Sequence, residues 1–276
     1  MRVEDAAKAY ERALGLGAKP FQGKVGPMEL NIPALQGIGG SLIYLVDRYA
    51  GNSGSLSIYD VDFVPIEGAA QQPAGAGLGE IDHLTHNVYA GRMDVWYDFY
   101  KKLFNFEEIR YFDIQGQKTG LTSRALTSPC GKIRIPINEP SDKGSQIQEY
   151  LDAYHGEGIQ HIALSCKDIY STVEALRKRE VRFLDTPDTY YERVDARVPN
   201  HGEDLARLQR NKILIDGEGV DKDHHEDKLL QIFTETVIGP IFFEIIQRKG
   251  NEGFGEGNFR ALFESIEADQ IARGVV

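Results

Sequence analysis

The sequence predicts an α+β fold built from repeats of a β-α-β-β-β module. A strand-like segment leads into a helix at three places, residues 3–18, 81–104 and 159–179. In the middle copy, Trp96, Phe99 and Leu103 recur at the spacing of one helix face. Short β-favouring segments separated by turn residues follow each helix. The same unit is therefore expected three times along the chain.

The first copy of the module is the least complete. Only Met1–Asp5 precedes its helix, whereas the later copies begin with whole strands. A sheet without its first strand exposes an unpaired edge, so we expect the chain to begin inside a module. The alternative is a first module that is natively short. Residues 67–79 are rich in Gly, Ala, Gln and Pro, which favours a linker between a partial, non-catalytic N-terminal domain (1–66) and a catalytic domain (80–276).

The composition excludes several classes of partner. The chain of 276 residues has a formal net charge of −11, which argues against nucleic acid or an anionic membrane as a partner. No apolar run approaches the ~20 residues that span a bilayer. Cys130 and Cys166 are the two cysteines and form no disulfide framework, so a cytoplasmic location is predicted.

One strand near the C-terminus carries an isolated carboxylate. Residues 241–246 are apolar and β-favouring except for Glu244. An ionised Glu is almost never fully buried unless it is paired, hydrogen-bonded or bound to a metal. Arg248 or Lys249, just downstream, could form an ion pair with it, and a metal ion could bind it. This strand alone leaves both readings open.

Two further strands offer histidines. His83 and His161 lie in strand-like segments, at intervals of 161 − 83 = 78 and 244 − 161 = 83 residues along the chain. We expect near-equal intervals if equivalent strands of a repeated module face one cavity. Side chains alternate in a strand, which puts His83 on a polar face and His86 on an apolar face, where a structural histidine is expected. Two His and one carboxylate form the facial triad of non-haem Fe(II) oxygenases.

Polar and aromatic side chains accompany this triad. Gln231 and Asn138 interrupt apolar strands, and buried amides need hydrogen-bond partners. Phe233 shares a strand face with Gln231, and Phe242 shares one with Glu244, which favours an aromatic substrate, although core packing also explains each Phe.

The last part of the chain suggests a lid. The glycine-rich segment 253–258 is expected to act as a flexible hinge. An amphipathic helix follows, with apolar residues at helical spacing, Phe259, Leu262, Phe263 and Ile266. Such a helix can close over a site and exclude water, or it can simply dock. The charged segment 216–228, which contains His224 and His225, is expected to be a solvated surface loop.

The sequence as a whole resembles the 4-hydroxyphenylpyruvate dioxygenase family of the vicinal-oxygen-chelate superfamily. The resemblance covers residues 78–276, and residues 1–66 resemble the second half of the family's N-terminal domain. The matching stretches are Asp82–Asn87, Asn105–Phe106 with Arg110–Phe112, Ile135–Glu139, Gly158–His161, Asp188–Tyr191, Leu230–Phe233, Phe243–Glu244 with Ile246–Arg248, and Gly253–Gly255 with Gly257–Phe259.

The resemblance implies a fold, a cofactor and a reaction. It implies a C-terminal pair of half-barrels that encloses Fe(II) held by His83, His161 and Glu244. It implies that Fe(II) and O2 convert 4-hydroxyphenylpyruvate to homogentisate and CO2 in tyrosine and phenylalanine catabolism. It also implies a homodimer or homotetramer. The implied catalytic residues are Gln231, Asn258 and Gln160, and the implied substrate-binding residues are Ser123, Asn138, Gln146, Phe233, Phe242, Phe254 and Phe259.

Other functions are weighed against this one. A 4-hydroxymandelate synthase would use the same substrate and iron site but hydroxylate the side chain. An extradiol dioxygenase would share the triad and turn over catechols, and a glyoxalase-type enzyme would use a metal without O2. From another class, an inactive fragment or binding protein would fold without binding Fe(II).

Overall fold

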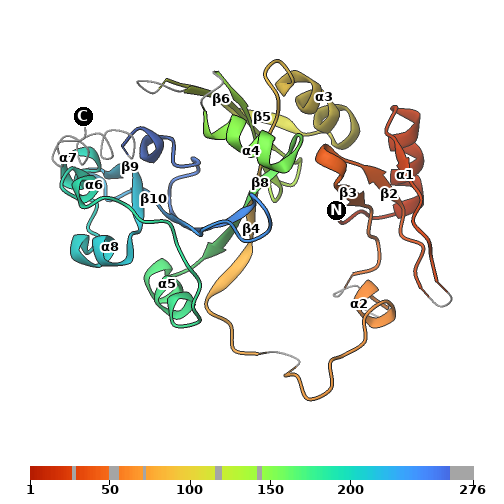
Figure 1. Cartoon of the computed structure of the whole chain (residues 1–276), viewed down its shortest axis with the longest axis horizontal. Coiled ribbons are helices and arrows are strands. Elements are labelled where there is room, and N and C mark those ends of the chain that lie inside the picture. The colour runs from red at the N-terminus through yellow and green to blue at the C-terminus, as the bar shows by residue number, and fades with distance from the viewer. Residues whose placement is uncertain (27–28, 50–55, 71–72, 116–119, 142–144, 262–276) are drawn as a thin grey trace. The chain divides into compact units, whose positions relative to one another are not determined.

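The computed structural model describes residues 1–26, 29–49, 56–70, 73–115, 120–141 and 145–261. The chain forms two compact units, one of Met1–Ala74 with Asp94–Glu107 and the other of Gly75–Met93 with Glu108–Val276. Figure 1 shows the course of the chain through both. Residues 94–107 thus group with the first unit, although they lie within the catalytic domain expected at 80–276. The domain boundaries stay a prediction.

The first unit contains a short antiparallel sheet and its helices. Its elements are α1 (Ala6–Gly15), β1 (Pro20–Phe21), β2 (Ala34–Gln36), the 3-10 helix η1 (Ile38–Gly40), β3 (Leu42–Tyr44), α2 (Ile58–Val61) and α3 (Met93–Phe104). The side chain of Asp5 caps α1 by accepting a hydrogen bond from the Lys8 amide. Arg2 forms an isolated parallel bridge with Val46, close to the end of β3. The opening residues of this module therefore pair beside its last strand.

The second unit is organised around one eight-stranded mixed sheet, in the order β5-β6-β7-β4-β8-β11-β10-β9. The strands are β4 (Leu78–Asn87), β5 (Glu107–Gln115), β6 (Gly120–Thr127), β7 (Arg134–Pro140), β8 (Gly158–Cys166), β9 (Leu214–Val220), β10 (Glu226–Phe233) and β11 (Phe242–Lys249). The helices are α4 (Gln146–Tyr154), α5 (Ile169–Arg177), α6 (Asp188–Tyr191), α7 (Val194–Arg197) and α8 (Leu205–Asn211), and residues 256–261 are also helical.

The sheet confirms the predicted repeat. One half follows the chain as β4, α3, β5, β6 and β7, and the other as β8, helices α5 to α8, β9, β10 and β11. In both halves the opening strand pairs in parallel with the last strand, and the two middle strands follow outward. The two opening strands, β4 and β8, join the halves as an antiparallel pair. The α+β fold of repeated β-α-β-β-β modules is confirmed.

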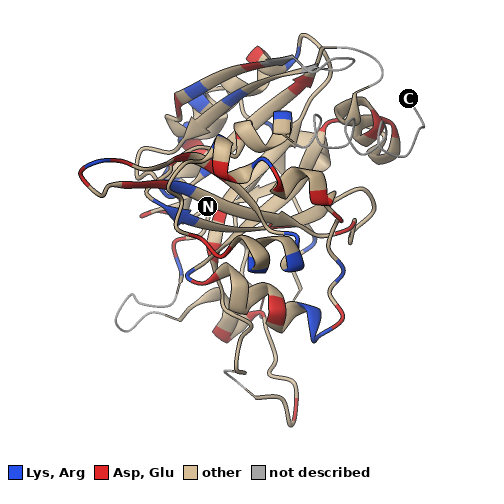
Figure 2. Cartoon of the chain, turned by 90° about the vertical axis from the view of Figure 1, so that its left-hand side faces the viewer, with Lys and Arg blue, Asp and Glu red and all other residues tan. Residues whose placement is uncertain are grey.

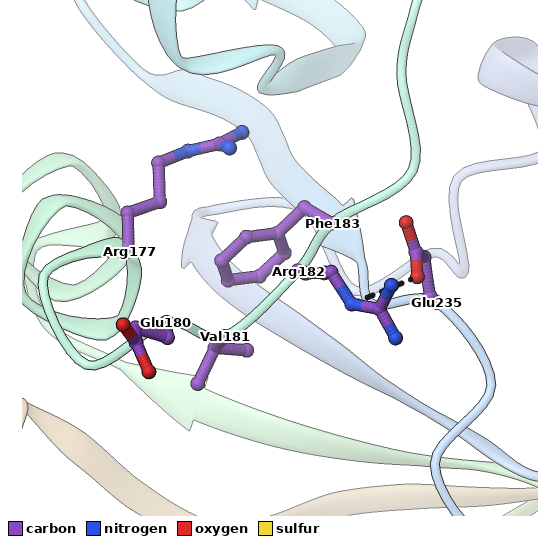
Figure 3. A pocket seen from close by; sticks show the side chains of 6 residues that line it. All are labelled: Arg177, Glu180, Val181, Arg182, Phe183 and Glu235. Carbon is purple, nitrogen blue, oxygen red and sulfur yellow. Dashed lines mark ion pairs between the residues drawn. The ribbon is translucent and has the colours of Figure 1, made fainter.

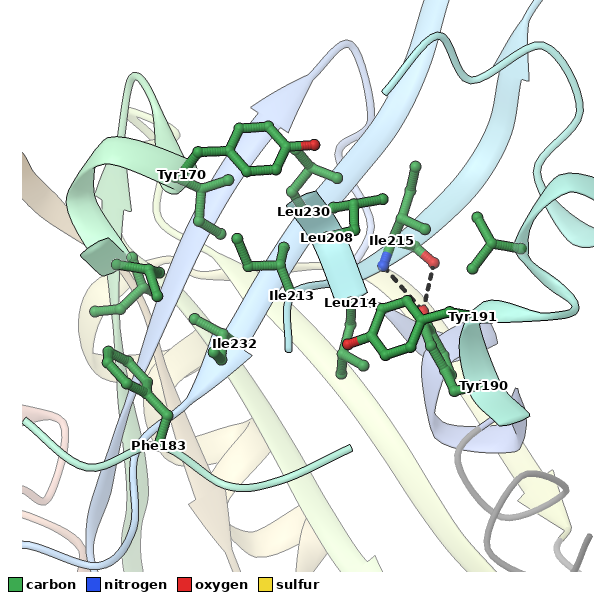
Figure 4. Packing of buried hydrophobic residues seen from close by; sticks show 14 of the residues in the cluster. Tyr170, Phe183, Tyr190, Tyr191, Leu208, Ile213, Leu214, Ile215, Leu230 and Ile232 are labelled. Atoms are coloured by element: carbon green, nitrogen blue, oxygen red, sulfur yellow. Dashed lines mark hydrogen bonds between the residues drawn. The ribbon is translucent and has the colours of Figure 1, made fainter. Parts of the chain in front are cut away.

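The main hydrophobic core lies between β9, β10, β11 and helices α5 to α8 (Figure 4). Helix α5 begins at the capping residue Asp168, and its buried residues Ile169, Val173 and Leu176 recur at helical spacing. Tyr190 is buried in this core, where its hydroxyl accepts a hydrogen bond from the backbone amide of Ile215. The core thus fixes β9 and β10, which border the candidate site.

The charged segment 216–228 was predicted to be one surface loop, and this prediction is wrong. Strand β9 extends to Val220 and β10 begins at Glu226, so only residues 221–225 connect them. Leu262, Phe263 and Ile266 of the expected lid helix lie outside the described residues. Cys130 and Cys166 are both free, as expected. Among the described residues, no helix is long and apolar enough to cross a membrane.

Candidate metal centre

The structure brings the three predicted metal ligands together on neighbouring strands. His83 lies on β4, His161 on β8 and Glu244 on β11, and their ligand atoms all lie within 4.8 Å of one another. The Nε2 atoms of His83 and His161 lie 3.2 Å and 3.3 Å from Oε2 of Glu244. Glu244 is 1% exposed. Because the register places Glu244 opposite Ala163, and Ala163 opposite His83, these side chains share one sheet face.

The near-equal intervals between the three ligands do not reflect equivalent strands, so the reason expected for them is wrong. Glu244 lies on β11, the last strand of its module, whereas both histidines lie on opening strands. Opposite the histidines, the last strands carry Arg134 and Phe242, and two residues further on they carry Pro136 and Glu244. The position equivalent to Glu244 in the other module is therefore a proline. This asymmetry leaves one carboxylate beside the two imidazoles.

The ion-pair alternative for Glu244 is not realised. The Arg248 guanidinium binds Asp82 instead, at 2.9 Å and 2.8 Å. The Lys249 ammonium lies 2.7 Å from Glu203. The second carboxylate oxygen of Glu244, Oε1, is buried and has no hydrogen-bond partner among the described residues. A buried carboxylate oxygen in this condition needs a cation or a donor.

Each ligand histidine is oriented by the residue that precedes it. Nδ1 of His83 lies 2.8 Å from Oδ1 of Asp82, and Nδ1 of His161 lies 3.2 Å from Oε1 of Gln160. Carboxylate and amide oxygens only accept hydrogen bonds, so both Nδ1 atoms carry the proton. In their neutral form, both imidazoles present Nε2 lone pairs toward Glu244. Three acceptor atoms that converge in this way need a proton or a metal cation between them, and two imidazoles with one carboxylate suit Fe(II).

Two β-bulges explain how Asp82 and Gln160 each contact the imidazole of the histidine that follows them in the chain. Between β4 and β8, the pairing advances two residues from Ile81 to His83 against one residue on β8. It later advances two residues from His161 to Ile159 against one residue on β4. Asp82 and Gln160 are the extra residues at these two bulges. A bulge re-aims a side chain that regular alternation would send to the opposite face, so each side chain can reach the adjacent imidazole.

The electrostatics favour a charged carboxylate in the centre. When no metal is bound and the imidazoles are protonated, burial raises the pKa of Glu244, but attraction to His83 and hydrogen bonds from both imidazoles outweigh it and lower the pKa to about 2. Burial similarly opposes ionisation of Asp82, and the Arg248 guanidinium reverses this effect, so its pKa lies below the ordinary value. Burial lowers the pKa of His86 to about 4, as expected for a histidine on the apolar face.

Aromatic rings line the two imidazoles. The ring of Phe242 stacks on His161 with centroids 5.0 Å apart, and Phe233 meets the same imidazole edge-on at 6.1 Å. The ring of Phe254 meets His83 edge-on at 5.2 Å. Three of the predicted substrate-binding residues therefore contact the metal ligands. Phe259 packs elsewhere, against the cluster formed by Leu121 and helix α4.

Two glycines of segment 253–258, Gly255 and Gly257, lie very close to polar side chains. A Cβ on Gly255, whose φ is +79°, would lie 1.9 Å from Oε1 of Gln231. A Cβ on Gly257 would lie 2.2 Å from Oδ1 of Asp216, and the Gly257 amide donates to Oδ2 of Asp216 at 2.8 Å. This reason differs from the flexibility expected from the sequence. Gln231 itself is buried, and its Oε1 has no partner among the described residues.

Asn258 is fixed by a buried tyrosine. The Tyr190 hydroxyl accepts hydrogen bonds from the Ile215 amide at 2.9 Å and from the Arg197 guanidinium at 2.6 Å. The hydroxyl hydrogen has two acceptors within reach, Oδ1 of Asn258 at 2.5 Å and the Ile215 carbonyl at 3.0 Å, and the shorter contact is the one to Asn258. The Asn258 amide nitrogen, which is buried, has no partner among the described residues. The orientation of this side chain is thus determined by its neighbours.

The remaining predicted pocket residues lie on β6, β7 and α4. Ser123 and Asn138 face each other across β6 and β7, and Asn87 on β4 continues the same row. Asn87 is buried, and neither of its amide atoms has a partner in the part of the chain that the structure describes. Gln146 is the first residue of α4 and is exposed. The structure gives Gln146 no contact with the metal ligands.

Sequence reasoning missed three residues that support the centre. Asp82 directly precedes His83, and Arg248 lies four residues after Glu244, but the sequence gave no sign that they pair across 166 positions. Tyr190 lies in a stretch that carried the family resemblance, without an assigned role. The signal available in the sequence was the carboxylate of Asp82 directly before the predicted ligand His83.

Other chemically suggestive places lie apart from the predicted site residues. A pocket is lined by Arg177, Glu180, Val181, Arg182, Phe183 and Glu235 (Figure 3), none of which is a predicted site residue. Its Arg182–Glu235 ion pair spans 3.2 Å. The exposed group Asp221, Asp223 and His225 could also hold a cation, as exposed acidic groups commonly could. Figure 2 shows acidic and basic residues interleaved along the ribbon.

Comparisons with known proteins agree with this fold. The family described as "Glyoxalase/Bleomycin resistance protein/Dioxygenase superfamily" matches residues 80–194. The family described as "Hydroxyphenylpyruvate dioxygenase, HPPD, N-terminal" matches residues 1–64. The fold and the His-His-Glu group thus define a member of the glyoxalase and dioxygenase superfamily.

Similar proteins narrow this class to one family. The chain is 62% identical to a 4-hydroxyphenylpyruvate dioxygenase from Pseudomonas aeruginosa and 62% identical to a hemolysin VllY from Vibrio vulnificus. Each match covers 100% of this chain and 75% of the relative. The chain belongs to the 4-hydroxyphenylpyruvate dioxygenase family.

Solved structures show the same architecture. A fusion of a xylose isomerase-like TIM barrel and a 4-hydroxyphenylpyruvate dioxygenase superposes with a TM-score of 0.73 at 35% identity, over 96% of this chain and 40% of the other. A mutant 4-hydroxymandelate synthase from Streptomyces coelicolor gives a TM-score of 0.72 at 25% identity, over 97% and 75% of the two chains.

Proposed function

We propose that this chain is an Fe(II)-dependent dioxygenase that converts 4-hydroxyphenylpyruvate and O2 to homogentisate and CO2, a step of tyrosine and phenylalanine catabolism. The observation that carries the proposal is the buried group of His83, His161 and Glu244, whose acceptor atoms lie within 4.8 Å of one another. The identity of the substrate is inferred from the family to which the chain belongs. When bound, Fe(II) would supply electrons for O2 activation and a template for the 2-oxoacid of the substrate.

The side chains around the centre have distinct proposed roles. His83, His161 and Glu244 would hold Fe(II), as two histidines and one carboxylate do in non-haem Fe(II) oxygenases. Gln231, Gln160 and Asn258 would orient the reacting oxygens. Gln231 and Asn258 each have a buried amide atom without a partner among the described residues, and Gln160 contacts the His161 imidazole. The aromatic wall of Phe233, Phe242 and Phe254 would exclude water and pack against the substrate ring.

The more distant pocket residues are proposed to bind the substrate's polar end. Ser123 and Asn138 lie opposite each other on adjacent strands, on the sheet face that also carries His83. Each offers donors and acceptors to a hydroxyl group. Gln146 and Phe259 are also proposed to contact the substrate, as the sequence predicted. Among the described residues, no contact places Gln146 beside the other proposed substrate-binding residues.

An anaerobic titration tests the proposal. Purified chain is reconstituted with Fe(II), mixed with 4-hydroxyphenylpyruvate and examined for a visible charge-transfer band. O2 is then admitted and the products are identified. We expect a band followed by homogentisate. A band followed by 4-hydroxymandelate would keep the metal site and overturn the reaction, and an iron-loaded, folded chain without the band would contradict substrate binding.

A matched pair of variants tests the ligand assignment. Glu244→Gln removes the buried carboxylate charge, so bound iron and turnover should both be lost. Glu235→Gln removes a half-exposed carboxylate that pairs with Arg182, away from the candidate metal centre, and serves as the control. Iron occupancy is measured after desalting. A Glu244→Gln variant that keeps full occupancy and turnover would refute the assignment.

Two coarser features complete the proposal. Self-association as a homodimer or homotetramer stays a prediction, and the molar mass from light scattering would test it. The reducing, cytoplasmic environment suggested by free Cys130 and Cys166 also stays a prediction. Fractionation of the native cells would test it.

A further inference from the structure

One guanidinium joins the C-terminal segment to the candidate metal centre. Nε and Nη2 of Arg248 donate to the two oxygens of Asp82, at 2.9 Å and 2.8 Å. Nη1 donates to the backbone carbonyls of Asn251 and Gly253, at 3.1 Å and 2.6 Å. Four hydrogen bonds therefore leave one side chain in two directions. Because a lysine ammonium cannot reproduce this planar fork, the arrangement is specific to arginine.

Both directions lead back to the same imidazole. Asp82 accepts the Nδ1 hydrogen of His83 at 2.8 Å. Phe254, which directly follows the bound carbonyl of Gly253, meets the His83 ring edge-on at 5.2 Å. The Arg248 guanidinium also lies over the Phe254 ring, 5.7 Å from its centroid. Arg248, Asp82, His83 and Phe254 thus form a closed ring of contacts.

The ring of contacts would not survive if either side were displaced. Asp82 is almost fully buried, and its other cationic neighbour, Arg134, is more distant at 3.5 Å and also binds Glu252 at 2.7 Å. Lifting residues 251–254 would remove two acceptors and an aromatic face from the half-buried Arg248 guanidinium. Rotating His83 would remove the partner of Asp82 and the edge contact of Phe254. The position of residues 251–254 and the orientation of the His83 imidazole are therefore energetically linked.

We propose that Arg248 is a positioning residue that couples the seating of residues 251–254 to the orientation of the metal ligand His83. This inference rests on the metal site of the proposed function. Coupling between two equilibria is reciprocal. Seating of the segment should strengthen metal binding, and metal binding should in turn hold the segment down.

Two measurements on the full chain test the coupling. The first is the Fe(II) dissociation constant, obtained anaerobically by competition with a chromophoric chelator. The second is amide hydrogen exchange of residues 251–258, compared with and without Fe(II). The variants are Arg248→Met and Arg248→Lys. The control is Arg207→Met, because Arg207 makes an equivalent forked pair with Glu174 and lies over the Tyr170 ring, away from this segment.

The expected results differ among the variants. In the wild-type chain, Fe(II) should slow exchange in residues 251–258. In Arg248→Met, Fe(II) should bind roughly 10- to 100-fold more weakly, as is common when the partner of a ligand histidine is disturbed, and the metal-dependent protection should disappear. Arg248→Lys should fall between the two, since it keeps the charge and loses the fork. Arg207→Met should match the wild type in both measurements.

Several outcomes would overturn the inference. One is an Arg248→Met chain that binds Fe(II) like the wild type or keeps its metal-dependent protection. If circular dichroism shows that Arg248→Met is unfolded, Arg248→Lys decides, and wild-type behaviour in both measurements would refute the coupling. A wild-type chain that fails to bind Fe(II) would instead contradict the proposed function. A wild-type chain that binds Fe(II) without protecting residues 251–258 would contradict the coupling alone.

Discussion

Replacing Gly255 by alanine is the sharpest test of how the C-terminal segment supports the site. The new Cβ would lie 1.9 Å from Oε1 of Gln231, 2.7 Å from its Cδ and 2.8 Å from its Nε2. Ordinary contact begins near 3.4 Å, so the Gln231 amide would have to move by 3.4 − 1.9 = 1.5 Å. Gln231 is 3% exposed and cannot swing freely into solvent. The substitution therefore displaces a proposed catalytic side chain without altering a metal ligand.

The cost has two parts. The backbone at Gly255 has φ of +79°, a conformation that costs an alanine about 1–2 kcal/mol. Overpacking against Gln231 adds about 1–3 kcal/mol. The sum, about 2–5 kcal/mol, should lower Tm by roughly 4–20 °C in a unit of this size. Displacing a catalytic group by more than 1 Å should lower kcat/KM on the order of 100-fold.

Gly91 provides the matched control. Its φ is +76°, close to that of Gly255, but a Cβ there would meet nothing within 4 Å. Gly91→Ala should therefore show only the conformational cost, with a fall in Tm of roughly 2–8 °C and unchanged kcat/KM. Thermal denaturation by circular dichroism measures the first quantity, and homogentisate formation under saturating Fe(II) measures the second. Iron content is measured alongside.

Comparing the two variants shows whether Gly255 is needed for its close approach to Gln231 or only for its backbone conformation. If Gly255→Ala and Gly91→Ala have the same Tm and the same kcat/KM, contact with Gln231 plays no part and the reasoning is refuted. If Gly255→Ala loses activity because iron is absent, the effect passes through the metal rather than through Gln231. Lost activity with normal iron content supports the close approach.

Two further predictions concern buried groups. Tyr190→Phe leaves the Ile215 amide and the Asn258 oxygen without their shared hydrogen-bond partner. The free energy of unfolding should therefore fall by about 1–3 kcal/mol, which urea denaturation would show as a lower midpoint. An unchanged midpoint would contradict this role of Tyr190. Burial lowers the pKa of His86 to about 4 from 6.5, so the folded metal-free chain binds fewer protons than the unfolded chain between these values. Stability should therefore fall as pH drops from 6.5 to about 4, by up to roughly 3 kcal/mol, and His86→Leu should lack this part of the slope; equal slopes in both chains would contradict it.

Much of the candidate site was predictable because strand alternation is a local property. The pleat separates His83 from His86 without any knowledge of the neighbouring strands, and the structure places His83 beside Glu244 and buries His86. Glu244 drew attention because a charge in an apolar strand needs a partner. The repeat was visible for the same reason, since each module carries its own strand and helix pattern.

Other predictions depended on strand pairing, which the sequence does not encode locally. The equal spacing of the three ligands suggested equivalent strands, yet Glu244 lies on a closing strand and its counterpart is Pro136. The bulges that bring Asp82 and Gln160 onto their histidines arise from one-residue differences between paired strands. Such offsets appear only when two strands are aligned in space.

The kinds of element, the ligand types and the need of Glu244 for a partner follow from local sequence, because hydrophobic periodicity and the cost of burying charge act on short stretches. Which partner each group received depends on how remote segments pack. Arg248 could have reached Glu244 along the chain, and folding instead placed it against Asp82. The glycines near residue 255 read as flexible from composition, and packing against Gln231 and Asp216 gives them another reason. Pairings of this kind depend on distances between remote segments, which are set by the whole sheet.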